Sequence, residues 1–300
     1  MVVHSISGLL VEFSAADGIL LHGFLEKPKK RTNTCIIYIH GMGGNFYKHA
    51  LVKKISKTAV SRNFAFFSMN TRGHDALAKS HSVKGGKKNI GTNLEVFEHC
   101  IRDIKGAINA LKKLGFSSFI LAGHSTGCQK VTYYQYKTKD RRVKALVLLA
   151  PADDFNIQKK SSAKKFSKVV KLAEALVKKR KPEVVLDVFD GFSAQRFLSI
   201  ASPKRVESRL FNYDSKLKEF SSITVPVYAC FGSKEEYATK PVKTLLSILA
   251  RKTNSVFFTP VVVKNANHGF NHHEEELARS VLKWLKTTNL AERSKYYNKL

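Results

Sequence analysis

The sequence places a serine between two glycines, in Gly-His-Ser-Thr-Gly at residues 123–127. An apolar run, 119–122, precedes this motif, and a segment without Gly or Pro, 128–137, follows it. A serine at such a strand-to-helix junction is typical of a nucleophile elbow, in which glycines allow a tight turn and the hydroxyl stands at the top of a sheet. The N-terminus of the following helix favours negative charge nearby. We therefore expect Ser125 to be a nucleophile.

A second motif, His-Gly-Met-Gly-Gly at residues 40–44, follows an apolar, β-branched strand. Acyl transfer passes through a tetrahedral intermediate with a negative oxygen, and backbone N–H groups aimed at that oxygen supply much of the catalysis. We expect these N–H groups from Thr126, directly after the serine, and from Met42, with Gly43 as the second choice. His40 precedes the serine in the chain, whereas the base of such a triad comes last. We therefore interpret His40 as a brace for its loop.

The base and the acid of a triad are expected downstream of Ser125. His268 follows the apolar run 256–263, on a loop before the final helix that can reach the serine. Glu235 lies three residues past the glycine that ends another apolar strand, 225–232. We expect His268 to accept the serine proton and Glu235 to fix the orientation of the imidazole.

Three other carboxylates are alternatives for the acid. Glu236 is the direct neighbour of Glu235. Asp153 and Asp154 follow the apolar strand 143–150, which is also a position from which an acid can reach the base. The sequence alone leaves all three open.

Together these motifs resemble the α/β-hydrolase superfamily, of the serine esterase and lipase type, over about residues 34–285. The resemblance rests on 40–44, on Asn-Thr-Arg-Gly-His-Asp at 70–75, on 123–127 and on Asn-His-Gly at 267–269. It implies an α/β fold with a mostly parallel sheet and helices on both faces. The acid is usually Asp in this superfamily and is Glu here, which leaves the choice between the two neighbouring glutamates open.

The function that the resemblance implies is hydrolysis of a carboxylic ester through an acyl-enzyme. The expected substrate is a small-molecule or lipid-like acyl ester, and no metal or organic cofactor is expected. Amide, thioester or acyl-transfer chemistry at the same triad is an alternative. A fold alone does not establish an activity, so a polyanion-binding protein on a hydrolase scaffold is the alternative from a different class.

The elements that must position these residues alternate between strand and helix. Residues 4–15 and 19–26 predict an antiparallel hairpin around an Asp-Gly turn. Thr-Asn-Leu-Glu at 92–95 predicts a capping box, and Gly115 predicts the end of the helix behind it. The continued alternation predicts a parallel sheet with helices on both faces. Arg72 and a nearby Asp at the end of one strand are expected to pair and brace their loop.

The alternation breaks between residues 155 and 222, where a connection between two buried strands needs only one helix. We therefore expect a hydrolase core of 1–154 and 223–290, a helical lid or cap of 155–222, and a tail of 291–300. Lids exclude water and determine substrate choice. The apolar face of the main lid helix is expected to consist of Ala163, Phe166, Val170, Ala173 and Val177.

The chain is strongly basic, with 52 Lys and Arg against 23 Asp and Glu and a net charge of +29. Such a charge favours binding to polyanions such as nucleic acid. Proteins that recognise phosphate groups specifically, however, tend to use Arg, whereas Lys dominates here and is spread along the chain. We expect a solvated basic surface and no specific nucleic-acid partner. Peripheral contact of the lid helix with an anionic membrane remains an alternative, and the oligomeric state is not indicated.

The hydrophobic share of 43% is sufficient for a large core. No apolar run approaches the ~18–20 residues of a membrane span, and the first ten residues lack a basic region ahead of their apolar residues. The four cysteines show no Cys-x-x-Cys spacing. We expect Cys35, Cys100, Cys128 and Cys230 to be reduced core residues of a cytoplasmic protein.

Overall fold

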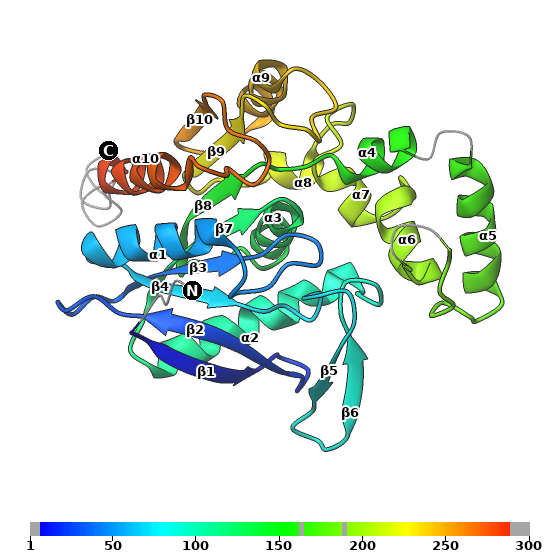
Figure 1. The fold of residues 1–300 in the computed structure, drawn as a ribbon, viewed down its shortest axis with the longest axis horizontal. Helices are drawn as coiled ribbons and strands as arrows, with labels where there is room; N and C mark the ends of the chain where they lie inside the picture. Colours follow the sequence, from blue (N-terminus) through cyan, green and yellow to red (C-terminus); the bar gives the residue numbers. More distant parts are fainter. Residues whose placement is uncertain (1–6, 162–164, 188–190, 289–300) are drawn as a thin grey trace.

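A computed structural model of the chain describes residues 7–161, 165–187 and 191–288 and contains an eight-stranded sheet with helices on both sides (Figure 1). The strand order is β1-β2-β4-β3-β7-β8-β9-β10. These strands are β1 Leu9–Ser14, β2 Leu20–Glu26, β3 Thr34–Ile39, β4 Ala65–Met69, β7 Ser118–His124, β8 Val143–Leu149, β9 Val227–Gly232 and β10 Phe258–Val263. A separate exposed hairpin is formed by β5 Ala78–His81 and β6 Lys87–Ile90.

The helices connect these strands and cover the sheet. They are α1 Ala50–Ser61, η1 Phe97–His99 (a 3₁₀ turn), α2 Cys100–Lys113, α3 Thr126–Thr138, α4 Asp154–Ser161, α5 Phe166–Lys178, α6 Ala194–Ala201, α7 Val206–Leu210, α8 Lys218–Ser221, α9 Val242–Lys252 and α10 Glu274–Thr287. Helices α1 and α10 pack side by side, and α3 packs against α2 and α8.

The sheet is antiparallel at its β1-β2-β4 edge and parallel from β4 to β10. Strands β3, β4, β7, β8 and β9 are buried along nearly their whole length and read as continuous apolar runs. This pattern is expected for parallel strands that are covered on both faces. The predicted mostly parallel sheet is confirmed, and so is the N-terminal hairpin for its described part; residues 4–6 lie outside the described residues.

The four cysteines are buried and unpaired, two in strands and two in helices, as predicted. None of the helices in the described ranges is long and apolar enough to cross a membrane.

The predicted capping box at residues 92–95 is wrong. Helix α2 begins only at Cys100, after η1. Glu95 is 3% exposed, and its carboxylate pairs with Lys130 of α3 at 2.6 Å instead of capping a helix. A tertiary ion pair of Glu95 thus takes the place of the local hydrogen bond that the Thr-x-x-Glu pattern predicted. The predicted helix end at Gly115, where φ is 94°, is confirmed.

Helices α4 to α8 form a helical insertion between β8 and β9, and α5 lies at its outer edge (Figure 1). The apolar face of α5, with Phe166, Val170, Ala173 and Val177, packs against α6 in an apolar cluster of the insertion itself. Ala163 lies outside the described residues, as does the tail 291–300. The insertion thus has its own small core.

A buried network of ion pairs joins this insertion to Glu95 and to helix α3, which packs on the sheet. Arg196 of α6 forms an ion pair with Glu207 of α7, and its second Nη lies 4.0 Å from the Glu95 carboxylate. The same guanidinium donates to the Thr92 carbonyl at 3.0 Å. All four charged side chains of the network, including Lys130, are at most 1% exposed. Because a buried charge is costly unless it is paired, each member depends on the others.

Replacement of Lys130 by Met tests this dependence. The Lys130→Met variant leaves the Glu95 carboxylate buried beside only the more distant Arg196, so the free energy of unfolding should fall by about 3–5 kcal/mol. Chemical denaturation monitored by circular dichroism measures the change.

Lys137→Met, at an exposed position of the same helix, is the matched control and should change stability by less than about 0.5 kcal/mol. Equal effects of the two substitutions would contradict the role of the buried pair.

Candidate active site

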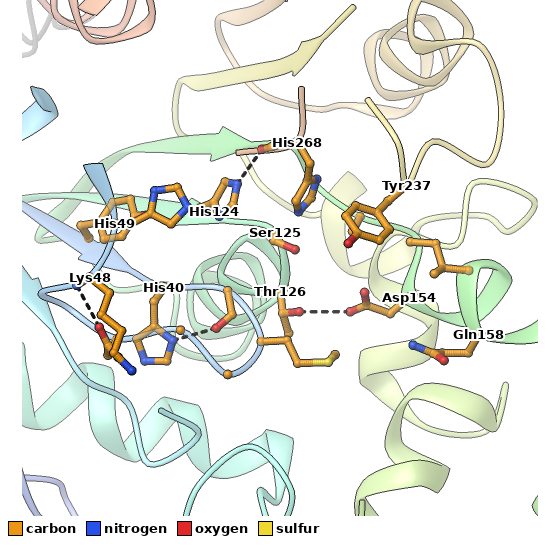
Figure 2. Close-up of a pocket in the computed structure, with 18 residues that line it drawn as sticks. His40, Lys48, His49, His124, Ser125, Thr126, Asp154, Gln158, Tyr237 and His268 are labelled. Atoms are coloured by element: carbon orange, nitrogen blue, oxygen red, sulfur yellow. Dashed lines mark hydrogen bonds between the residues drawn. The ribbon is translucent and has the colours of Figure 1, made fainter. Parts of the chain in front are cut away.

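The residues singled out by the sequence converge at the carboxyl ends of five neighbouring strands. Met42 follows β3, Ser125 follows β7, Asp154 follows β8, Glu235 follows β9 and His268 follows β10. In parallel sheets these ends share one edge, where ligands bind. All but Glu235 line a cavity of about 360 Å³ (Figure 2). This cavity is the candidate active site.

Ser125 occupies a strained turn between β7 and α3. Its φ is 54° and its ψ −125°, a conformation rarely adopted by a residue with a side chain. Its N–H donates to the Leu149 carbonyl at 2.9 Å. A Cβ on Gly123 would lie 2.3 Å from the Gly127 carbonyl oxygen, and one on Gly127 would lie 2.2 Å from the Ile39 carbonyl oxygen. Both glycines of the motif are therefore required by close backbone contacts.

His268 and Glu235 are in direct contact. The Nδ1 atom of His268 lies 2.7 Å from Oε1 of Glu235, whose side chain is only 2% exposed. A carboxylate there fixes Nδ1 as the protonated nitrogen and leaves Nε2 as an acceptor. The His268 imidazole and the Ser125 hydroxyl lie on the same side of the cavity, with the imidazole above the serine in Figure 2.

The loops that carry this acid and base are joined by backbone contacts. Lys234 N–H donates to the Ala266 carbonyl at 2.8 Å, and Ser233 N–H donates to the Val263 carbonyl at 2.9 Å. A Cβ on Gly232 would lie 2.2 Å from the Ala266 oxygen, so only glycine allows the two loops to approach this closely. The separation of acid and base is therefore fixed by the backbone.

The alternative acids make other contacts. Glu236 accepts the backbone N–H of His268 at 2.6 Å and so holds the loop instead of the ring. Asp153 accepts a backbone N–H three residues later at 3.0 Å and caps α4. Asp154 accepts from a glutamine of α3 at 2.8 Å. Of the four carboxylates, Glu235 is the one that contacts the imidazole in the described structure.

The two expected amide donors also lie at the cavity. Thr126 is the first residue of α3, so its N–H has no partner within the helix. Met42 and Gly43 line the same cavity. A Cβ on Gly41 would lie 3.0 Å from the Ser125 Cβ, so this loop passes close beside the serine. The role of these two N–H groups in an oxyanion hole stays a prediction.

His40 braces the Met42 loop, as predicted. Its Nδ1–H donates to the Gly41 carbonyl at 2.8 Å, and its Nε2 accepts the Thr71 N–H at 3.1 Å. Burial, reinforced by the nearby charge of Lys130, lowers the pKa of His40 to about 3. The ring is therefore neutral at physiological pH.

His124, the variable residue before the serine, was missed as a functional position. Its Nε2–H donates to the backbone carbonyl of His268 at 2.9 Å and thereby ties the base loop to the elbow. Its ring also lies between the rings of His49 and His268, with centroids 5.4 and 4.9 Å away. Burial, with a smaller effect of charge on His268, lowers the pKa of His124 to about 3. Tyr237 packs edge-on against the His268 ring at 4.8 Å.

The expected pairing of Arg72 with a neighbouring Asp is corrected by the structure. The Arg72 guanidinium bonds to Asp103 at 2.7 and 2.9 Å and to Asp17 at 2.9 Å. Asp75 instead pairs with His74 at 2.8 Å. Sequence proximity suggested the wrong partner, because α2 brings a fully buried carboxylate closer.

The insertion reaches the cavity through α4, which contributes Ile157 and Gln158 to its wall. Within the described ranges, no three His, Cys, Asp or Glu side chains are grouped in a way that could hold a metal ion.

The sheet order, the helices on both faces and the turn at Ser125 are those of the α/β-hydrolase fold. The chain belongs to the family described as "Protein of unknown function (DUF1749)", whose model matches residues 1–287. No curated protein matches the chain.

Solved structures with this fold are similar over nearly the whole chain. Siderophore hydrolase EstB from Aspergillus fumigatus has 18% identity and a TM-score of 0.69, covering 94% of this chain and 98% of its own. Est1E from Butyrivibrio proteoclasticus, with bound ferulic acid, has 20% identity and a TM-score of 0.64, with coverages of 92% and 98%. Esterase Pf2001 from Pyrococcus furiosus has 14% identity and a TM-score of 0.61, with coverages of 94% and 92%. These similarities confirm the fold class.

The lowered pKa of His124 predicts acid sensitivity. Below the unfolded-state pKa of about 6.5, the unfolded chain binds a proton that the native ring does not bind until about pH 3. Stability therefore falls as the pH falls, and His124 contributes up to ~1.4 kcal/mol per pH unit to the slope. His124→Gln should reduce the slope between pH 6 and about 4 by that amount, as measured by denaturant unfolding.

His81→Gln, at an exposed position, is the matched control and should keep the wild-type slope. An unchanged slope in His124→Gln would show that burial of a neutral ring is not the cause.

Proposed function

We propose that the protein is a serine hydrolase that cleaves carboxylic esters through an acyl-enzyme. The observation that carries the proposal is the Glu235–His268 pair, at 2.7 Å, beside Ser125, which sits in a strained turn and lines the same cavity. An imidazole that is oriented by an acid can activate a serine hydroxyl as its general base. Strained backbone is typical of functional sites, and here it carries the serine.

In the proposed mechanism, Ser125 attacks the acyl carbon while Nε2 of His268 accepts its proton. The N–H groups of Thr126 and Met42 stabilise the negative oxygen of the tetrahedral intermediate. The imidazolium, stabilised by Glu235, then protonates the leaving alcohol. A water molecule deprotonated by His268 releases the acid and restores the serine.

Two observations support an ester as the scissile bond and a small acyl group. Among the similar structures, one is named an esterase and another a siderophore hydrolase. The cavity, at about 360 Å³, is near the lower end of the range for small-molecule sites, ~300–1,000 Å³. Amide, thioester or acyl-transfer chemistry would use the same residues.

Removal of the nucleophile tests the reaction. Wild-type protein should release p-nitrophenol from p-nitrophenyl butyrate, and Ser125→Ala should lose at least about 10³-fold in kcat/KM because the covalent step is gone. Ser61→Ala, at an exposed position of α1, is the control and should keep wild-type activity.

A preparation that is inert on esters of graded acyl length, but binds nucleic acid at physiological salt, would overturn the enzymatic proposal. It would favour a polyanion-binding protein.

The identity of the acid is tested by two neighbouring isosteric substitutions. Glu235→Gln removes the charge that orients and stabilises the His268 imidazolium, so kcat should fall by about 10²–10⁴. Glu236→Gln retains an oxygen that can accept the His268 N–H, so its kcat should stay within about tenfold of wild type. Stopped-flow and steady-state assays on one ester measure both. The reverse order of effects would assign the acid to Glu236.

A further inference from the structure

Asp154 is an acidic residue of the cavity that the proposed triad does not use. It is the first residue of α4 and only 8% exposed. Its Oδ2 accepts from the Gln129 side chain at 2.8 Å and lies 3.5 Å from the Thr126 hydroxyl. No hydrogen bond in the described part of the chain reaches Oδ1, and this oxygen is not sealed from solvent. Asp154 therefore presents one free oxygen to the cavity (Figure 2).

A purely structural role does not account for Asp154. The side chain that caps α4 is Asp153, which accepts the Asn156 N–H at 3.0 Å. Gln129 is already held by the Ala152 carbonyl, to which it donates at 2.9 Å. The side-chain cap of α4 is thus formed without Asp154, although an acid in the first turn is generally favourable there.

The surroundings of Asp154 leave it without a cationic partner. The charge of Arg196 acts on Asp154, but this guanidinium is committed to Glu207 and Glu95. Burial, followed by the negative charge of Glu207, raises the pKa of Asp154 to about 8. A buried carboxylate without a cation is costly, so Asp154 holds its proton. A bound ligand that supplies a cation favours the ionised form.

The strongly basic exterior does not oppose such a ligand at short range. At physiological salt, exposed charges are screened beyond about 8 Å, whereas a contact inside a cavity is screened much less. The net charge of +29 therefore affects the approach of a cation less than Asp154 affects its final position. Since Asp154 contacts the residue next to the nucleophile, the cation must lie a few bonds from the ester carbon.

We infer that Asp154 is a specificity-determining residue that binds a protonated amino group of the ester substrate. This inference rests on the proposed function. The substrate class is an amino ester, with the amine on either the acyl or the alcohol side. On binding, the proton held by Asp154 leaves to solvent, and the carboxylate forms an ion pair with the ammonium group.

Two pairs of matched esters test the inference. Ethyl 3-aminopropanoate and ethyl butanoate differ by an amine on the acyl side, and 2-(dimethylamino)ethyl butanoate and 3-methylbutyl butanoate differ by one on the alcohol side. The wild-type protein should prefer the amine member of at least one pair by about tenfold or more in kcat/KM. In Asp154→Asn, which keeps the size and an acceptor for Gln129, that ratio should fall to about one.

Asp214→Asn, an exposed acid of the insertion, is the matched control and should keep the wild-type ratio. Where the wild-type protein hydrolyses these esters, the inference is overturned if it shows no amine preference in either pair, or if Asp154→Asn keeps the preference.

Calorimetry separates this outcome from failure of the proposed function. The amine esters are titrated into Ser125→Ala and into Ser125→Ala/Asp154→Asn. Binding to these variants is measured without any hydrolysis of the ester. At least one should bind the first variant about tenfold more tightly than the second. Tight, Asp154-dependent binding without hydrolysis by the wild-type protein would contradict only the proposed hydrolysis. Equal or undetectable binding to both variants would contradict the role of Asp154 in binding the amino group.

Discussion

The structure depends on three backbone segments that meet at the elbow with no room for side chains. The end of β3 and the start of α3 approach so closely that any residue larger than glycine at 127 would collide with the Ile39 carbonyl oxygen. At 123 the collision would be within the turn itself. This packing holds Ser125 at a positive φ that a free loop would not keep. The cavity, the amide donors and the base loop are all built around that fixed point.

Buried polar contacts extend this constraint outward from the elbow. His40 bonds to Thr71, which accepts from Lys130 at 3.0 Å, and Lys130 pairs with Glu95. Arg196 then links the same acid to the insertion. One continuous polar chain therefore joins the Met42 loop to the helices that follow β8. Because a buried charge is costly without its partner, a shift of the insertion would disturb contacts that reach the loop.

The sequence was sufficient to predict the sheet, the elbow and the contact between Glu235 and His268, because each depends on local signals at strand ends. It favoured Glu235 as the acid but left Glu236, Asp153 and Asp154 open, since the partners of these side chains come from distant loops. The Thr-x-x-Glu pattern at 92–95 misled, because a tertiary partner on α3 outcompeted the local cap. His124 had no signal of its own, because its bond to the His268 carbonyl joins residues 144 positions apart in the chain.

The central claim is that the Ser125 hydroxyl and the N–H groups of Thr126 and Met42 act on one acyl group. A crystal structure of the protein after reaction with an alkyl fluorophosphonate tests it most directly. The account predicts phosphorus bonded to Oγ of Ser125, with the phosphoryl oxygen within about 3 Å of the N–H groups of both Thr126 and Met42. Phosphorus on another residue, or a phosphoryl oxygen turned away from both amides, would contradict it.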